Sequence, residues 1–402
     1  MRGRREKWRK GRTAMNLNEI QALDDECVLH TYGRLPVALD HGKGCEAWDT
    51  EGKHYYDFTS GIGVNAFGYC DDGWVRAVTE QAGRIQHMSN YYYCEKNALL
   101  AAALQKASGM GRAFFCNSGA EANECAVKVA RRFGEKKGAH KIVTLKNSFH
   151  GRTITTLAAN GQDAFHEYFL PLTEGFVYAE ANDIADLEQK LDDTVCAVLL
   201  ESVQGEGGVI PLDTDYLRAV RRLCDERGAL LMLDEVQTGV GRTGYFFSYQ
   251  GCGVQPDVVT AAKGLGGGLP IAACLVSKAL GDIFTPGMNG STFGSNPVAS
   301  AGALEMVTRI NDAAFLAAVR EKGEYFRAAL SKLEGVEYVR GRGLMLGIKL
   351  KNRDAHDVME ACARAGLLIL TAKSLVRFLP PLTITKEEID AGLRIFAEQI
   401  KG

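Results

Sequence analysis

The residue best suited to chemistry in this sequence is a lysine within a run of small residues. Lys263 stands two positions after the apolar segment 258–261 and is followed by Gly264. Burial disfavours the charged ammonium group, so such a lysine has a lowered pKa and can form a Schiff base with an aldehyde. A surface lysine in a glycine-rich loop is the ordinary alternative. A P-loop is rejected, because the spacing G-x-x-x-x-G-K-S/T is absent.

An acidic residue ends another apolar segment. Asp234 follows residues 229–233, and Gln237 lies three positions later. A buried carboxylate is costly without a cationic partner, and the protonated nitrogen of a pyridine ring is such a partner. Gln237 is then placed to bond a hydroxyl of the same ring. Taken alone, a structural ion pair or a metal-binding acid explains Asp234 equally well.

The residues Asn117–Glu121 have the pattern of a helix start. Ser118 is placed as the N-cap residue, and Glu121, three positions later, predicts a capping box. Backbone amides at a helix start bind anions, and Gly119 beside Ala120 lets a phosphate approach the backbone. For this segment alone, an ordinary capped helix is the stronger interpretation.

Two other segments carry groups suited to a cofactor or a substrate. Phe149 is suited to stacking on an aromatic ring, and Arg152 to binding a carboxylate through two hydrogen bonds. Ser291 and Thr292 place two hydroxyls in a turn bounded by glycines. Each also has an ordinary interpretation, as a core aromatic, a surface arginine or a turn residue.

These side chains need a framework that brings them together. From about residue 95, helical periodicity alternates with short apolar runs. The runs are 141–145, 195–200, 229–233, 258–261 and 272–276. Continuous apolar strands between helices predict an α/β protein with a buried, mostly parallel sheet. Ligands bind beyond the carboxyl ends of such strands, where Glu201, Asp234 and Lys263 fall.

Four parts of the chain are expected. They are a basic segment at 1–14, an N-terminal segment at 15–60, a large domain at 61–300 and a smaller C-terminal domain at 301–402, to which the N-terminal segment also contributes. Residues 45–60 predict a β-hairpin, and Pro297 begins a long helix that ends near Arg309.

The residues Gly239–Gly244 fit the dinucleotide-binding pattern G-x-G-x-x-G. The aromatic residues that follow show no helical periodicity, so the strand–turn–helix context of that motif is missing. We therefore do not expect a dinucleotide site here.

Composition sets the broad limits. The net charge is −2, so no general electrostatic attraction to nucleic acid is expected. The first fourteen residues hold seven basic residues and one acidic residue. They are interpreted as a disordered tail, or as residues upstream of a true start at Met15, rather than as a targeting peptide. The 11 cysteines form no C-x-x-C pair, which favours free thiols in a reducing cytoplasm and no structural zinc. No apolar stretch is long enough for a membrane helix.

Together the segments resemble the class III aminotransferases, the ω-aminotransferases of PLP fold type I. The matching segments, in the family's order, are 118–121, 149–152, 204–208, 234–244, 263–268 and 290–297. The resemblance runs from about Asn18 to the C-terminus. It implies a large domain with a seven-stranded-type, mostly parallel sheet flanked by helices, plus a smaller α+β domain. It also implies pyridoxal 5'-phosphate (PLP) as the cofactor and a homodimer with shared active sites.

The resemblance assigns roles to individual residues. Lys263 would carry the cofactor as a Schiff base and move the proton, and Asp234 would pair with the pyridinium. The other implied cofactor-binding residues are Ser118, Gly119, Ala120, Phe149, Gln237 and, from the neighbouring subunit, Thr292. The implied substrate-binding residues are Arg152, Ser291, Glu206 and Arg377.

Four segments, beginning at residues 204, 234, 341 and 377, are most similar to the branch of the family that acts on N-acetylornithine. This similarity implies transfer of the terminal amine to 2-oxoglutarate, a step of arginine biosynthesis. Ornithine, succinyl-ornithine, succinyl-diaminopimelate and 4-aminobutyrate are alternative donors. A decarboxylase, an aminomutase and a non-enzymatic PLP-binding regulator are alternative functions. Ser202 and Ser295 depart from the family, which often has proline and glycine there.

Overall fold

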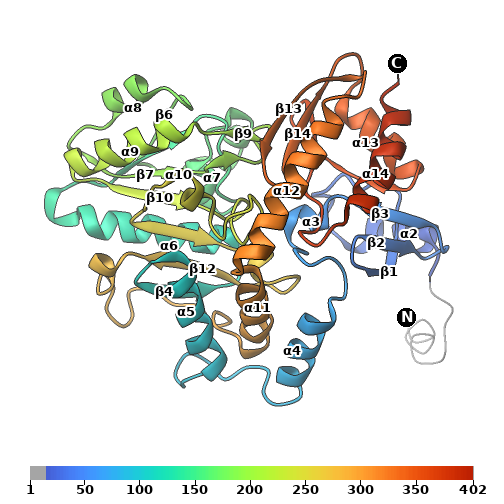
Figure 1. Ribbon diagram of the computed structural model, residues 1–402. Helices are drawn as coiled ribbons and strands as arrows, with labels where there is room; N and C mark the ends of the chain where they lie inside the picture. The colour runs from blue at the N-terminus through green and yellow to red at the C-terminus, as the bar shows by residue number, and fades with distance from the viewer. Residues whose placement is uncertain (1–14, 402) are drawn as a thin grey trace.

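A seven-stranded sheet forms the centre of the protein in the computed structural model, which describes residues 15–401 (Figure 1). The prediction for residues 1–14 lies outside the described residues. The strand order is β4 (Arg112–Cys116), β12 (Ala272–Val276), β11 (Val258–Ala261), β10 (Leu230–Asp234), β7 (Val195–Leu200), β5 (Lys141–Leu145) and β6 (Phe176–Ala179). Within this sheet, β12 alone runs in the direction opposite to the other six strands. The predicted mostly parallel sheet is confirmed.

All five apolar runs form strands of this sheet, and one boundary differs from the prediction. The strand β10 begins and ends one residue later than expected, and Asp234 is its last residue. The strands β4 and β6 were not predicted. Both lie at the edges of the sheet and are partly exposed, although each contains a short apolar run, at 113–116 and 176–179.

Helices cover both faces of the sheet, which explains why its strands are apolar throughout. Alternate residues of β7 enter two different clusters. Ala197 and Leu199 pack with α6 (Gly119–Gly134), whereas Val198 and Leu200 pack in the cluster that includes α9 (Thr214–Arg227). The other helices of this part are α5 (Glu95–Ser108), α7 (Ile154–Ala159), α8 (Ile184–Lys190) and α10 (Ser248–Cys252).

The two ends of the chain share one four-stranded sheet. Its strands are β1 (Leu39–Lys43), β2 (Glu46–Asp49), β3 (His54–Asp57) and β15 (Leu367–Leu368). The antiparallel pair β2–β3 confirms the predicted hairpin. The strand β15 lies parallel to β3, with Leu367 opposite Tyr56, so segments 311 residues apart lie side by side (Figure 1). The domain boundaries themselves stay a prediction.

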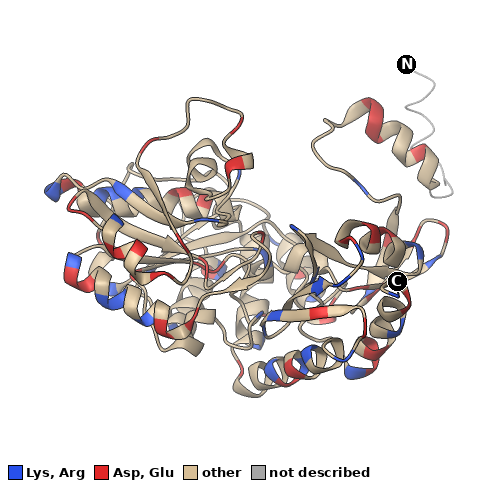
Figure 2. Ribbon diagram, turned by 90° about the horizontal axis from the view of Figure 1, so that it is seen from above, with Lys and Arg blue, Asp and Glu red and all other residues tan. Residues whose placement is uncertain are grey.

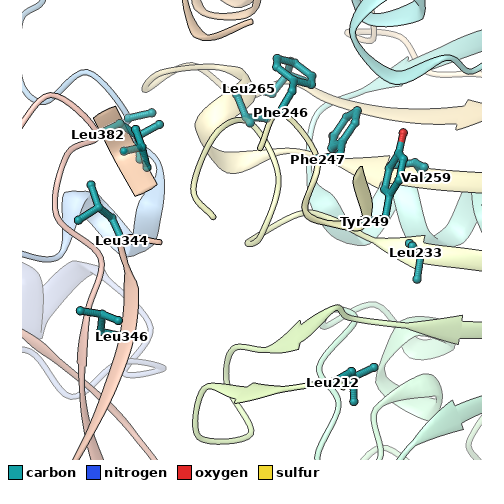
Figure 3. Packing of buried hydrophobic residues seen from close by; sticks show 14 of the residues in the cluster. Leu212, Leu233, Phe246, Phe247, Tyr249, Val259, Leu265, Leu344, Leu346 and Leu382 are labelled. Atoms are coloured by element: carbon teal, nitrogen blue, oxygen red, sulfur yellow. The ribbon is translucent and has the colours of Figure 1, made fainter. Parts of the chain in front are cut away.

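A third sheet completes the C-terminal part. It contains β13 (Val336–Arg342), β14 (Met345–Leu350), β17 (Leu375–Phe378) and β16 (Leu370–Ala372), with α12 (Ala313–Leu330), α13 (Ala355–Arg364) and α14 (Lys386–Gln399) around it. Leu344 and Leu382 from this part belong to the same buried cluster as Phe246 and Leu265 (Figure 3). Leu344 N also donates to the Arg242 carbonyl (3.0 Å), so the C-terminal part packs against the segment that follows Asp234.

The predicted long helix is α11 (Pro297–Ile310), with Asn296 as its N-cap, and it packs against α4 (Asp72–Ala82) and α5.

The helix α2 (Leu17–Cys27) has no buried residue. Basic and acidic residues are interspersed along the outer helices (Figure 2). Within residues 15–401, no helix is long and apolar enough to span a membrane.

The residues Gly239–Gly244 form turns, and the helix α10 that follows has only five residues. Arg242 is buried in this segment, and its Nη1 donates to the backbone carbonyls of Leu344 and Pro380. Burial lowers the pKa of Arg242 to about 9. The segment thus connects the large sheet to the C-terminal part.

Candidate active site

One cavity of about 430 Å³ opens at the carboxyl ends of the central strands. Eight of the twelve residues predicted to bind cofactor or substrate line it: Ser118, Gly119, Ala120, Phe149, Arg152, Asp234, Gln237 and Lys263. Ser291, Thr292, Glu206 and Arg377 do not line it. The rule that ligand sites lie beyond the strand ends pointed to Glu201, Asp234 and Lys263, and all three line this cavity.

Lys263 begins the short 3-10 helix η4 (Lys263–Leu265), just after β11. Its backbone φ is 48°, a left-handed conformation that costs a non-glycine residue on the order of 1–2 kcal/mol. Burial lowers the pKa of the Lys263 ammonium to about 8. The amine is therefore more often neutral, and more nucleophilic, than an exposed lysine near pH 7.

Asp234 lies on the neighbouring strand β10 and is 4% exposed. Its Oδ2 accepts hydrogen bonds from Asn123 Nδ2 (2.7 Å) and contacts His150 Nδ1 (2.8 Å), and its Oδ1 accepts from Val236 N (3.0 Å). Three contacts fix the carboxylate at the cavity wall. This arrangement is suited to a cationic ring nitrogen in the cavity.

Asn123 and His150 were not assigned roles from the sequence, yet both line the cavity and are buried. Asn123 also donates to the His150 carbonyl (2.8 Å) and accepts from Thr260 Oγ1 (2.7 Å), so its side chain links α6 to β11. The sequence did contain one signal for Asn123. It is a polar residue on the apolar face of a helix, and a buried amide requires hydrogen-bond partners.

The start of α6 differs in one detail from the predicted capping box. Ser118 Oγ accepts from Glu121 N (3.3 Å), as expected. The Glu121 carboxylate, however, accepts from Asn117 N (3.1 Å) and from the Ser118 hydroxyl (3.0 Å) rather than from Ser118 N. The amides of Gly119 and Ala120 donate to no group in the described part of the chain. These free amides at the cavity are suited to an anion.

The glycine at position 119 also has a packing reason that the sequence did not show. A Cβ atom there would lie 2.8 Å from Val236 Cγ1. The helix start and Val236, two residues after Asp234, therefore approach each other too closely for a side chain at 119. Glycine thus allows the free amides at the helix start to lie close to the segment that carries the carboxylate.

Phe149 forms another wall of the cavity, and a buried acid holds its backbone. Phe149 N donates to Glu201 Oε1 (2.8 Å), and Gly205 N donates to Glu201 Oε2 (3.1 Å). Burial raises the pKa of Glu201 to about 7. The Arg152 guanidinium is exposed and lies 4.2 Å from the centre of the Phe165 ring. Among the described residues Arg152 forms no ion pair, so it can bind a ligand's carboxylate.

Glu206 and Arg377 form an ion pair that reaches the cavity through Gln237. Arg377 Nη1 donates to Glu206 Oε1 (2.6 Å) and to Gln237 Oε1 (3.1 Å), and Gln237 Nε2 donates to Glu206 (3.2 Å). Burial opposes ionisation of Glu206, but the charge of Arg377 outweighs it and holds the Glu206 pKa below its ordinary value. The pair stays ionised at neutral pH and is lost only as the pH falls through that lowered pKa.

Ser291 and Thr292 do not line the cavity in this chain. Ser291 Oγ accepts from Asn117 Nδ2 (3.3 Å), next to the start of α6, whereas Thr292 is exposed. Ser295 has φ 66°, a left-handed conformation favourable for the family's glycine. Ser202 is fully buried, and its hydroxyl has no partner within residues 15–401.

The fold and the site define an α/β enzyme of the aminotransferase type, in which one cavity is lined by a half-buried lysine and by an aspartate on the adjacent strand. The family model "Aminotransferase class-III" matches residues 28–400, and the chain belongs to this family.

Similar proteins span nearly the whole chain. The acetylornithine aminotransferase of Haemophilus ducreyi is 46% identical over 389 residues, which cover 96% of this chain and 99% of that protein. That of Methanocaldococcus jannaschii is 44% identical over 94% of this chain and 96% of that protein. The solved structure of Toxoplasma gondii ornithine aminotransferase, described with PLP at its active site, has a TM-score of 0.92 at 31% identity and covers 98% of this chain and 97% of that chain.

Proposed function

We propose that the chain binds pyridoxal 5'-phosphate in the cavity and transfers amino groups through it. When bound, this cofactor supplies a ring that accepts electrons from the carbon bearing the amine. The observation that carries the proposal is one cavity lined by both the Lys263 amine and the Asp234 carboxylate, at the ends of adjacent strands. Lys263 would hold the cofactor aldehyde and move the proton at its Nζ.

The other cavity residues fit the remaining parts of the same group. The free amides of Gly119 and Ala120, with Ser118, are suited to the phosphate, and Phe149 is suited to covering the ring face. Asp234 would keep the ring nitrogen protonated. These residues are proposed as the cofactor site, with Gln237 beside the ring oxygen and Thr292 supplied by a second copy of the chain.

We further propose N-acetylornithine as the amino donor and 2-oxoglutarate as the acceptor. Relatives that are 44–46% identical over at least 92% of the chain are acetylornithine aminotransferases, which supports this choice. Ornithine is the second candidate donor, because the ornithine aminotransferase structure has a TM-score of 0.92. The test is glutamate formation from 2-oxoglutarate with a panel of ω-amino donors. Product formation without any 2-oxo acid would indicate a decarboxylase or an aminomutase instead.

A homodimer in the cytoplasm is proposed as the working form. Tyr91, Tyr92 and Tyr93 are each more than 70% exposed, and α2 buries none of its residues. Contiguous exposed aromatic residues favour a protein interface. The 11 free cysteines suit a reducing compartment. Sedimentation velocity of the purified protein would measure the mass of the assembly.

The Glu206–Arg377 pair is proposed to let one site accept two substrates that present different ends. The α-carboxylate of 2-oxoglutarate would bind Arg377 when Glu206 moves away. While the pair is closed, Arg377 is neutralised and does not attract the α-carboxylate of the ω-amino donor. The first half-reaction then proceeds at the distant amine.

The variant Glu206→Gln tests this role. It leaves the charge of Arg377 free, so kcat/KM for glutamate as donor should rise relative to kcat/KM for N-acetylornithine. One such charge interaction changes the ratio by about tenfold, which corresponds to about 1.4 kcal/mol. Steady-state kinetics with the two donors measure the ratio. An unchanged ratio would show that Glu206 is not the switch.

The variant Arg152→Ala tests the proposed clamp for the donor's α-carboxylate. Losing a charged hydrogen bond costs about 1.5–3 kcal/mol, so the KM for N-acetylornithine should rise roughly 10- to 100-fold. Arg152→Lys keeps the charge without the planar fork and should fall between the wild type and the alanine variant. A KM within about twofold of wild type in Arg152→Ala would remove Arg152 from the substrate site.

A further inference from the structure

A second cavity, of about 270 Å³, shares no lining residue with the candidate active site. Its wall comes from Thr214 at the start of α9, residues 243–252, α12 and the end of β13. Three arginines line it, Arg320, Arg327 and Arg342. Glu324 is the one acidic residue in its lining, so the cavity has an excess of positive charge.

The three guanidinium groups are held in place by the fold and keep donors to spare. Arg327 Nη2 donates to the Gly341 carbonyl (2.9 Å) and contacts Glu324 (3.4 Å). Arg342 donates to the Leu212 carbonyl and to Cys252 Sγ. Each guanidinium has five N–H donors, and these contacts use one or two of them.

Arg320 is positioned by the segment that follows Asp234 in the chain. Its Nη1 donates to the Gly244 carbonyl, and its guanidinium lies 4.9 Å from the centre of the Tyr245 ring. The aromatic ring orients the cation without neutralising it.

Two buried hydroxyls in the lining have no partner. Thr243 is 4% exposed and Ser248 is 2% exposed, and neither side-chain oxygen forms a hydrogen bond within the described part of the chain. A buried hydroxyl without a partner is costly, so native proteins normally satisfy it with protein, water or ligand. A group bound in this cavity is the partner that residues 15–401 do not supply.

We propose that this cavity binds a small oxyanion that carries phosphate or carboxylate groups. Arginine forks bind both groups through paired, charge-assisted hydrogen bonds. The anion would connect α12 and β13 of the C-terminal part to residues 243–252. These residues follow β10, the strand that carries Asp234, in the chain. Binding would therefore stabilise the junction between the two parts of the enzyme.

The test is calorimetric titration of the PLP-loaded protein with inorganic phosphate and, separately, with citrate, at constant ionic strength. In the double variant Arg320→Gln/Arg327→Gln, affinity for the bound anion should fall at least about tenfold. Arg222, an exposed arginine of α9 that does not line the cavity, provides the matched control Arg222→Gln, which should bind as the wild type does. Comparing the two titrations shows whether the cavity prefers a phosphate or a carboxylate.

The variant Glu324→Gln gives a readout of opposite sign and does not depend on the arginine variants folding. Removing this carboxylate, the only one in the lining among residues 15–401, should strengthen anion binding by a few-fold, roughly the effect of one exposed charge. Binding of neither anion, or binding that none of these variants alters, would overturn the proposal.

Discussion

Replacing Lys263 with alanine is expected to lower kcat for glutamate formation by roughly 10⁴-fold or more, because one side chain both holds the cofactor and transfers the proton. The left-handed backbone at 263 strains alanine and lysine alike, so the fold should be retained. The cofactor absorbance that reports attachment to a lysine should also disappear. Stopped assays with N-acetylornithine and 2-oxoglutarate measure the loss.

The chain offers a matched control for this variant. Lys278 begins η5 (Lys278–Leu280), a 3-10 helix that also follows a strand of the central sheet, but its side chain is exposed. Lys278→Ala should keep wild-type turnover and absorbance. If Lys263→Ala retained more than about a tenth of the wild-type kcat, Lys263 would not be the residue that moves the proton.

Asp234→Asn is the second change with a large expected effect. The carboxylate would keep the ring nitrogen protonated, and removing one such fixed charge typically lowers kcat by about 10²- to 10³-fold. Asparagine also has one acceptor oxygen where the two carboxylate oxygens receive Asn123, His150 and Val236. We expect lower kcat with the cofactor still bound, measured as turnover per bound cofactor.

A variant of the neighbouring acid, Glu235, is the control that distinguishes a loss of catalysis from a loss of stability. Glu235 is fully buried but does not line the cavity, and it accepts hydrogen bonds from the Thr238 hydroxyl and from the backbone N of Ser248 and Tyr249. Burial raises the pKa of Glu235 to about 7. Glu235→Gln should lower the Tm and leave kcat nearly unchanged. Equal kcat losses in both variants would indicate that Asp234 acts through the fold alone.

The central sheet could be predicted because its inner strands are covered on both faces. Such strands are continuous apolar runs, as residues 195–200 and 258–261 show. Their carboxyl ends then directed attention to Asp234 and Lys263. The edge strand Phe176–Ala179 was missed although its four residues are apolar; it pairs only with β5 and is partly exposed.

Residues that act through long-range contacts could not be predicted in the same way. Asn123 and His150 lie 111 and 84 residues before Asp234 in the chain, so they meet it only after distant segments are brought together. The reason for glycine at 119 is Val236, a contact invisible in the local sequence. The three-way bond among Glu206, Gln237 and Arg377 depends on the C-terminal sheet lying against the large one.

The parallel pairing of Leu367–Leu368 with Tyr56–Asp57 has a consequence for biosynthesis. A polypeptide leaving the ribosome carries the hairpin at residues 46–57 long before its partner strand exists. The edge of β3 therefore stays unpaired and accessible to other chains until more than nine-tenths of the protein has been synthesised. A premature stop codon before position 367 would leave that edge permanently uncovered, and the truncated product would be a substrate for chaperones and proteases.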